Sequence, residues 1–311
     1  MRLIKQEKIF EKAPFAECHA STIVLTRGDD KTCAWFGGEK EGKNDVRIWY
    51  SRQKDGIWSE PEPIPAVADL PHWNPVLFET CKGEITLFYK VGATIPNWKT
   101  YFCTTRDGGL TWSAPKELVP GDESGGRGPV KNKCLIHSSG ALLAPASDER
   151  GAWRCFIDRF DGEKWEKRPI PVPEENGRLH MIQPTLWESE SGDVHALMRT
   201  QNGYIYRSDS KDGGKTWCKA YPTVIPNNNS GIDCTKTTNG TIALLCNPVQ
   251  KGRTPLSLLL SHDGGATFEK ALDLETEIGE YSYPAIVSQS NNLFITYTHN
   301  RKVISYVEIE L

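Results

Sequence analysis

The sequence predicts an all-β protein, a six-bladed β-propeller with Asp-box hairpins, that spans residues 1–311 as one domain. Three observations support this prediction: a motif that recurs about every 52 residues, short strand-like runs between its copies, and no long helical segment. A chain of 311 residues is long for a single domain, but propellers and barrels often reach this length.

The recurring motif reads Ser/Thr-x-Asp-Gly-Gly-x-Thr-Trp/Phe. Complete copies occupy residues 105–112, 210–217 and 261–268, and weaker copies occupy residues 51–58 and 158–165. The aromatic residues that end the five copies lie 54, 53, 52 and 51 positions apart. Asp followed by Gly-Gly supplies side-chain-to-backbone hydrogen bonds and positive φ angles, so each copy is predicted to form a hairpin turn. This motif is the Asp box, and its aspartates are interpreted as structural rather than catalytic.

Between the motifs the chain reads as short strands separated by turn residues. The fourth repeat contains four such runs between residues 180 and 224. Four strands in about 52 residues fit one propeller blade, and 311 residues therefore correspond to six blades. The sixth blade has no motif. Its outer strand is expected from residues 3–10, which would close the ring against residues 303–311.

Composition excludes several classes of protein. The net charge is −3, so the chain lacks the excess of positive charge that is typical of proteins that bind nucleic acids or membrane surfaces. The nine cysteines are spaced singly, which indicates neither a zinc site nor a disulfide framework, and free thiols favour a reducing compartment. With no apolar signal core and no run of transmembrane length, the sequence predicts a cytoplasmic protein without a membrane partner. No metal or cofactor is predicted.

A binding site is expected where the innermost strands of the blades meet the central axis. The candidate innermost strands are residues 17–24, 72–78, 128–136, 180–187, 229–236 and 280–287. They begin with many polar residues, whereas ordinary strands would alternate polar and apolar ones. Polar side chains that converge from six blades suit an acidic sugar. A hydrated channel without a ligand would show the same pattern.

Two arginines extend this expectation. Arg199 ends an apolar run, and Arg253 precedes another. An arginine beside buried apolar residues usually has a planar anionic partner, because its guanidinium binds a carboxylate through two parallel hydrogen bonds. Each could bind a substrate carboxylate, or form an internal ion pair with Asp233 or Glu280.

With these residues and its repeated motif, the whole chain resembles the sialidase (neuraminidase) superfamily, in particular its sialidase-like BNR/Asp-box repeat proteins. The resemblance implies that Arg199 and Arg253 hold a substrate carboxylate and that Tyr281 is the nucleophile. It also places Glu41 or Glu39 near the family's acid/base residue, with Asp45 as the next candidate. The family has a further arginine and a glutamate at positions that in this chain correspond to His19 and Gln183.

Three functions are compatible with this pattern, and the first is preferred. An exo-glycosidase would release a terminal acidic, sialic-acid-like sugar from a glycan or oligosaccharide, with Tyr281 attacking and Glu41 protonating the leaving oxygen. A polysaccharide lyase would eliminate at a glucuronate, for example a rhamnosyl-glucuronate linkage, a reaction that His19, His72, Tyr281 and an arginine would suit. A non-catalytic propeller would only bind the carbohydrate.

The complete predicted site has two parts. The catalytic candidates are Tyr281, Glu41, His19 and His72. The substrate-binding candidates are Arg199, Arg253, Arg127, Lys131, Gln183, Asp45, Asn229 and Asp233.

Overall fold

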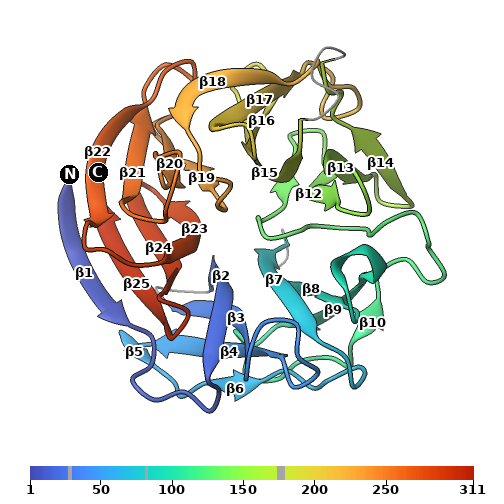
Figure 1. Ribbon diagram of the computed structural model, residues 1–311, viewed down its shortest axis with the longest axis vertical. Coiled ribbons are helices and arrows are strands. Elements are labelled where there is room, and N and C mark those ends of the chain that lie inside the picture. Colours follow the sequence, from blue (N-terminus) through green and yellow to red (C-terminus); the bar gives the residue numbers. More distant parts are fainter. Residues whose placement is uncertain (27–29, 81–82, 174–178) are drawn as a thin grey trace.

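Six antiparallel sheets surround a central axis in the computed structural model, which describes residues 1–26, 30–80, 83–173 and 179–311 (Figure 1). Each sheet forms one blade, whose strands run in order from the axis to the rim. In the described residues, the only helix is a single 3-10 turn at Ile95–Asn97. The predicted all-β, six-bladed propeller is confirmed.

The six blades consist of the following strands, from the axis outward. Blade one has β2 (Glu17–Leu25), β3 (Lys31–Gly38), β4 (Arg47–Lys54), β5 (Ile57–Trp58) and β6 (Glu62–Pro63). Blade two has β7 (His72–Glu79), β8 (Ile85–Val91), β9 (Lys99–Thr105) and β10 (Lys116–Glu117). Blade three has β11 (Leu135–Ile136), β12 (Leu142–Asp148), β13 (Arg154–Phe160) and β14 (Trp165–Pro169). Blade four has β15 (Met181–Glu188), β16 (Val194–Thr200), β17 (Tyr204–Ser210) and β18 (Tyr221–Pro226). Blade five has β19 (Asp233–Lys236), β20 (Ile242–Cys246), β21 (Leu256–Ser261) and β22 (Glu269–Glu275). Blade six has β23 (Tyr281–Gln289), β24 (Asn292–His299), β25 (Val303–Glu310) and β1 (Arg2–Lys8).

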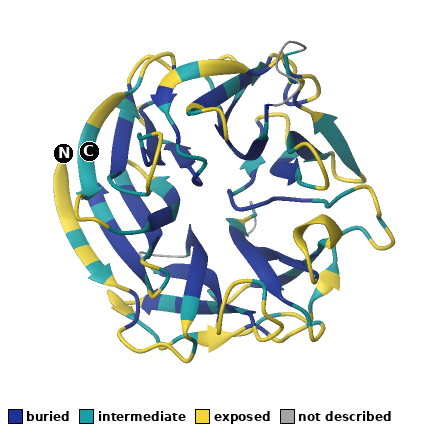
Figure 2. Ribbon diagram, in the orientation of Figure 1, coloured by how far each residue is buried: buried dark blue, intermediate teal, exposed yellow. Residues whose placement is uncertain are grey.

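The core lies between neighbouring blades. Buried residues gather on the inner strands, and exposed residues lie on the rim (Figure 2). Strands β3 and β8 are buried at every position, because a second strand is covered on both faces by adjacent blades. Burial on both faces replaces the alternation of polar and apolar residues that a half-exposed strand would show. The eight cysteines in the described residues are free, and Cys81 lies outside those residues.

The ring closes as predicted. Strand β1 pairs antiparallel with β25, from Arg2 opposite Glu310 to Lys8 opposite Ser305. In Figure 1 the first strand lies next to the last one. The closing strand also contacts blade one, because the Trp58 indole N–H donates to Glu7 Oε1 at 3.0 Å.

The three complete motifs form the predicted hairpins. In the second one, Asp212 Oδ1 accepts hydrogen bonds from Ser210 Oγ and from the backbone N–H of Thr216, both at 2.8 Å. Burial opposes ionisation, but these bonds outweigh it and lower the pKa of Asp212 to about 2. The weaker copies instead form tight Asp-Gly turns, as at Asp55, where φ is 50°. The structural interpretation of the motif aspartates agrees with these contacts.

The third blade differs from its prediction. Residues 128–136 were expected to form an inner strand, but within them only Leu135–Ile136 is a strand of the blade. The segment before β11 runs to the axis, where its side chains replace backbone pairing. Asn132 Nδ2 donates to the carbonyls of Gln183 and Pro184 at 3.0 and 2.9 Å. Lys131 Nζ donates to the carbonyl of Ile232 at 2.8 Å and also to that of Pro284.

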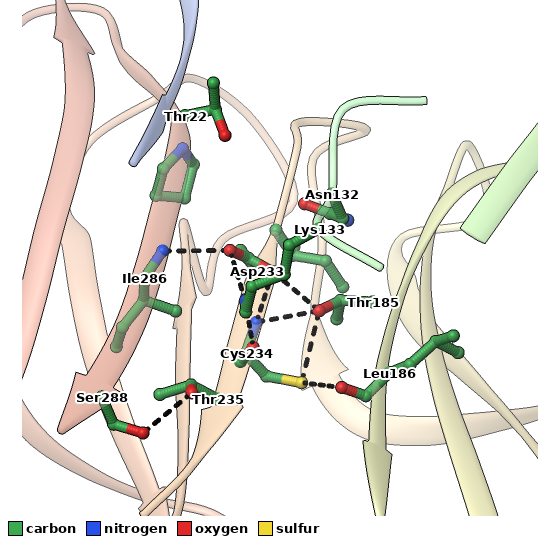
Figure 3. Close-up of polar contacts among 12 residues, drawn as sticks. Thr22, Asn132, Lys133, Thr185, Leu186, Asp233, Cys234, Thr235, Ile286 and Ser288 are labelled. Carbon is green, nitrogen blue, oxygen red and sulfur yellow. Dashed lines mark hydrogen bonds and ion pairs between the residues drawn. The ribbon is translucent and has the colours of Figure 1, made fainter. Parts of the chain in front are cut away.

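A further set of contacts between blades has the Asp233 carboxylate at its centre (Figure 3). Its carboxylate accepts two bonds from Lys133 Nζ, at 3.0 and 2.9 Å. It also accepts from Thr185 Oγ1 at 2.8 Å and from the backbone N–H of Ile286 at 3.0 Å. One buried carboxylate of blade five therefore joins blades three, four and six. Asp233 and Lys131 were predicted to bind substrate, but their polar atoms are used in links between blades.

Replacing Asp233 by Ala is expected to lower the free energy of unfolding by about 3–5 kcal/mol, because Lys133 then keeps a poorly solvated charge without its partner. Urea denaturation measures this change. The matched control is Asp69→Ala, because the Asp69 side chain is 87% exposed and its loss should change stability by less than about 0.5 kcal/mol. An Asp233→Ala protein as stable as the control would contradict the role of the link.

Candidate functional site

In each blade, the innermost strand starts at the end of the axis where the second strand finishes. The register pairs Glu17 with Gly38 in blade one and Tyr281 with His299 in blade six. We call this end the N-terminal mouth. Because strands alternate in direction, the Asp boxes, which follow third strands, lie at the opposite end. The candidate site therefore has to be built from inner-strand starts and second-strand ends.

A bulge recurs in four inner strands near this mouth. The register shifts between His19 and Thr22, and the same shift occurs in β7, β15 and β23. Each bulge contains a non-glycine residue with positive φ: Ala20 (59°), Asn74 (44°), Gln183 (54°) and Tyr283 (51°). Such residues are costly in free energy and often occur where a bulge re-aims a side chain at a functional site.

Arg199 is the centre of one group of polar side chains. It is only 6% exposed, and its Nη1 donates to Gln183 Oε1 at 3.0 Å and to the Tyr283 hydroxyl at 3.1 Å. Its Nε donates to Asn229 Oδ1 at 3.2 Å. Gln183 Nε2 also donates to the Tyr283 hydroxyl, at 3.2 Å. The phenol oxygen thus accepts two hydrogen bonds, and its own O–H can be directed elsewhere.

His19 lies against this group. Its ring centroid is 4.2 Å from that of Tyr283, the residue is 2% exposed, and Nδ1 has no hydrogen-bond partner in the described residues. Burial, followed by the positive charges of Arg301, Arg253 and Arg199, holds the pKa of His19 well below its usual range. The imidazole is therefore neutral, and its surroundings are electropositive.

A second group consists of two arginines and two glutamates. Glu280 Oε1 accepts from Arg253 Nη1 at 2.7 Å and from Arg301 Nε at 3.0 Å. Arg301 Nη1 also binds Glu41 Oε2 at 2.6 Å. In the described part of the chain, Nη2 of Arg199, Arg253 and Arg301 makes no hydrogen bond. Each of these arginines thus keeps one amino group without a protein partner in the described residues.

The placement of Tyr281 does not match its predicted role. Its ring packs between blades five and six and meets His299 edge-on at 4.9 Å. Tyr283, two residues further on, is the tyrosine that contacts Arg199. The bulge between Ser282 and Ala285 is the physical reason, because it changes which residue faces the axis.

His72 and Arg127 also lie outside the groups described above. Both ring nitrogens of His72 bond to the backbone, Nδ1 to the carbonyl of Leu70 at 2.8 Å and Nε2 to the N–H of Val67 at 3.3 Å. Burial lowers the pKa of His72 to about 4. Arg127 forms a bidentate pair with the buried Asp158, at 2.8 and 3.0 Å. Both residues stabilise blades through these contacts, and neither belongs to the two polar groups at the mouth.

The two predicted acids near the mouth already have partners. Glu41 is paired with Arg301, as described above. Asp45 is exposed and accepts the backbone N–H of Glu39 at 2.6 Å, so it stabilises its own loop. Of the predicted residues, the structure brings His19, Gln183, Arg199 and Asn229 together, with Arg253 and Glu41 in the neighbouring group.

Sequence reasoning missed Arg301 and Tyr283. Arg301 lies in the turn between β24 and β25, with φ of 54°. Its signal was an Asn-Arg pair at the end of an apolar strand. The described residues contain no group of three or more His, Cys, Asp or Glu side chains that could hold a metal ion. Nor do they contain a helix with the length and apolar character needed to cross a membrane.

Comparisons with known proteins agree with this fold. Residues 30–295 match the BNR repeat-like domain, so the chain belongs to that family. A protein of unknown function from Dyadobacter fermentans DSM 18053 superposes with a TM-score of 0.83 at 17% identity, over 100% of this chain and 99% of the other. A Hadza microbial sialidase has a TM-score of 0.80 at 17% identity, over 96% and 66%. The NanB sialidase from Streptococcus pneumoniae has a TM-score of 0.76 at 14% identity, over 98% and 70%. The predicted resemblance to sialidase-like BNR repeat proteins is confirmed.

His19 should make stability depend on pH. Its pKa is 6.5 in the unfolded chain and well below that in the folded one, so below about pH 6.5 only the unfolded chain takes up this proton. Stability from this group is therefore complete above that pH and is lost as pH falls. His19→Gln should lose less stability than the wild type between about pH 7.5 and about pH 5, measured by urea denaturation. Other titratable groups, including His72, contribute equally to the pH dependence of stability in both proteins, so their contributions cancel in the comparison. Equal losses would contradict the neutral state of His19.

Proposed function

We propose that this chain is an exo-glycosidase that releases a terminal acidic sugar from a glycan or oligosaccharide. The observation that carries the proposal is that Arg199, Arg253 and Arg301 each have an amino group without a hydrogen-bond partner in the described part of the chain. The charges of all three act on His19, which lies against Tyr283. A sugar carboxylate is planar and anionic, and several arginine N–H groups can bind its two oxygens at once.

Glu280 prepares the arginines for this role. It binds Arg253 and Arg301 through one carboxylate oxygen and so holds their side chains side by side. Its own side chain is 35% exposed, which leaves the pair accessible to solvent and ligand. Arg199, held by Asn229 and Gln183, would contribute the third guanidinium from blade four.

Tyr283 is the proposed nucleophile. Two N–H groups, from Arg199 and Gln183, stabilise negative charge on its oxygen. The Gln183 amide cannot accept the phenol proton, so neutral His19, in ring contact with Tyr283, is the proposed acceptor. The tyrosine oxygen would bond to the anomeric carbon as the glycosidic C–O bond breaks and the leaving oxygen is protonated. Water would then hydrolyse the intermediate, and a neutral nucleophile avoids repulsion by the sugar carboxylate.

Elimination at a uronate is the second candidate. It is favoured by the placement of neutral His19 against Tyr283, because the pair could act as base and acid beside a carboxylate that arginines neutralise. Elimination forms an unsaturated uronate that absorbs in the near ultraviolet, whereas hydrolysis forms none. Sialosides and glucuronides, assayed for both signals, distinguish the two reactions. Binding of either sugar without turnover would favour a non-catalytic propeller.

Arg199→Ala is expected to weaken binding of an acidic monosaccharide by roughly 10- to 100-fold, as expected when a charge-assisted contact of about 1.5–3 kcal/mol is removed. Isothermal titration calorimetry measures the change. Arg106→Ala, at the Asp-box end of the axis, removes the same charge and should leave binding unchanged. If both variants bind like the wild type, the carboxylate clamp is wrong.

Tyr283→Phe is expected to abolish turnover and to retain sugar binding, because it removes only the reacting oxygen. Tyr281→Phe is the matched control, since its ring lies between blades, and it should retain both. Initial rates and binding affinity are measured for each protein. Loss of turnover in Tyr281→Phe with activity kept in Tyr283→Phe would reverse the assignment.

A further inference from the structure

Glu149 has an unusual position at the N-terminal mouth. It directly follows β12, the second strand of blade three. Lys90 and Arg199 lie near the ends of the second strands in blades two and four. The carboxylate therefore stands between two cations that adjacent blades contribute at similar positions, and both cations act on it electrostatically.

The contacts of Glu149 differ from those of the other glutamates at this mouth. In the described ranges its one side-chain hydrogen bond comes from Ser147 Oγ, at 3.2 Å, and no cation lies within ion-pairing distance. Glu41 and Glu280, in contrast, are paired with Arg301. Glu149 also lines a small cleft with Lys90 and the half-buried Trp98, whose indole N–H has no partner in the described residues. A carboxyl group at this position is free to bond to a ligand.

The charged groups around Glu149 come from several elements. Arg199 approaches from β16 and Lys90 from β8, and the neighbouring Asp148 is paired with Arg150 at 2.8 Å. Burial, and after it the charge of Glu149, raises the pKa of the Cys155 thiol on β13. Burial raises the pKa of Glu149 and outweighs the opposing charge of Arg199. A raised pKa is the direction of shift that a general acid requires.

We propose that Glu149, rather than Glu41, is the general acid/base of the glycosidase. This inference rests on the proposed function and adds the proton donor to the same site. Glu149 gives its proton to the glycosidic oxygen as the bond from that oxygen to the anomeric carbon breaks. The resulting carboxylate then takes a proton from the water that cleaves the bond between Tyr283 and the sugar. Glu41 acts through Arg301 as a positioning residue.

The test compares Glu149→Gln and Glu41→Gln on two glycosides of the same acidic sugar, sialic acid or glucuronic acid. One glycoside has a nitrophenol leaving group, which departs without a proton, and the other has an alkyl alcohol, which needs one. Glu149→Gln should lose about 10²- to 10⁴-fold in kcat/KM on the alkyl glycoside and less than about 10-fold on the nitrophenyl glycoside. It should also lose the fall in activity at high pH that deprotonation of the acid causes in the wild type.

Asp148→Asn is the matched control, since it changes a neighbouring carboxylate that Arg150 already binds, and it should behave like the wild type. Unchanged Tm and sugar affinity show that Glu149→Gln is folded. Equal loss on both glycosides, no loss, or leaving-group dependence in Glu41→Gln instead would overturn this inference alone. No turnover or binding of either acidic sugar by the wild type would overturn the proposed function, and the inference with it.

Discussion

Hydrogen bonds that cross the central axis hold in place the backbone from which the candidate site is built. Blade three lacks most of an inner strand, and Lys131, Asn132 and Lys133 replace it by bonding to blades four, five and six. Two of their acceptors are the carbonyls of Gln183 and Pro284, which are part of or next to the bulges that aim Gln183 and Tyr283 at the mouth. The same buried polar atoms therefore hold the blades together and fix the backbone beneath Tyr283. A polar network of this kind is stable only when each member has its partner.

Charge at the mouth is balanced in an unusual way. The sialidase pattern has an arginine and a glutamate where this chain has His19 and Gln183, and His19 is neutral. One positively charged and one negatively charged side chain of the family pattern are thus both absent, so these two differences leave the net charge of the site unchanged. Arg301 contributes a guanidinium from a different blade, and Glu280 holds it beside Arg253. The mouth therefore retains several guanidinium groups although two positions of the family pattern differ.

The repeat made the fold predictable, because an Asp-Gly-Gly turn at a constant interval requires one blade per repeat. The site was only partly predictable. Arg199, Gln183 and His19 could be found because they flank apolar strands in register with the repeat. Tyr283 was missed because a bulge exchanges the faces of consecutive residues, and a bulge has no reliable sequence signal. The irregular start of blade three was missed because its side chains bond across the axis to residues far away in sequence.

Closure of the ring has a consequence for how the candidate site forms during synthesis. The ion pair between Arg2 and Glu310 joins residues 308 positions apart, so the final sheet cannot assemble until almost all of the propeller has left the ribosome. Contacts of such long range slow folding, because the loop-closure entropy is lost before they form. Arg301 belongs to that last sheet, whereas Arg199 is made about a hundred residues earlier. A nascent chain can thus complete the N-terminal mouth only in the step that also closes the ring.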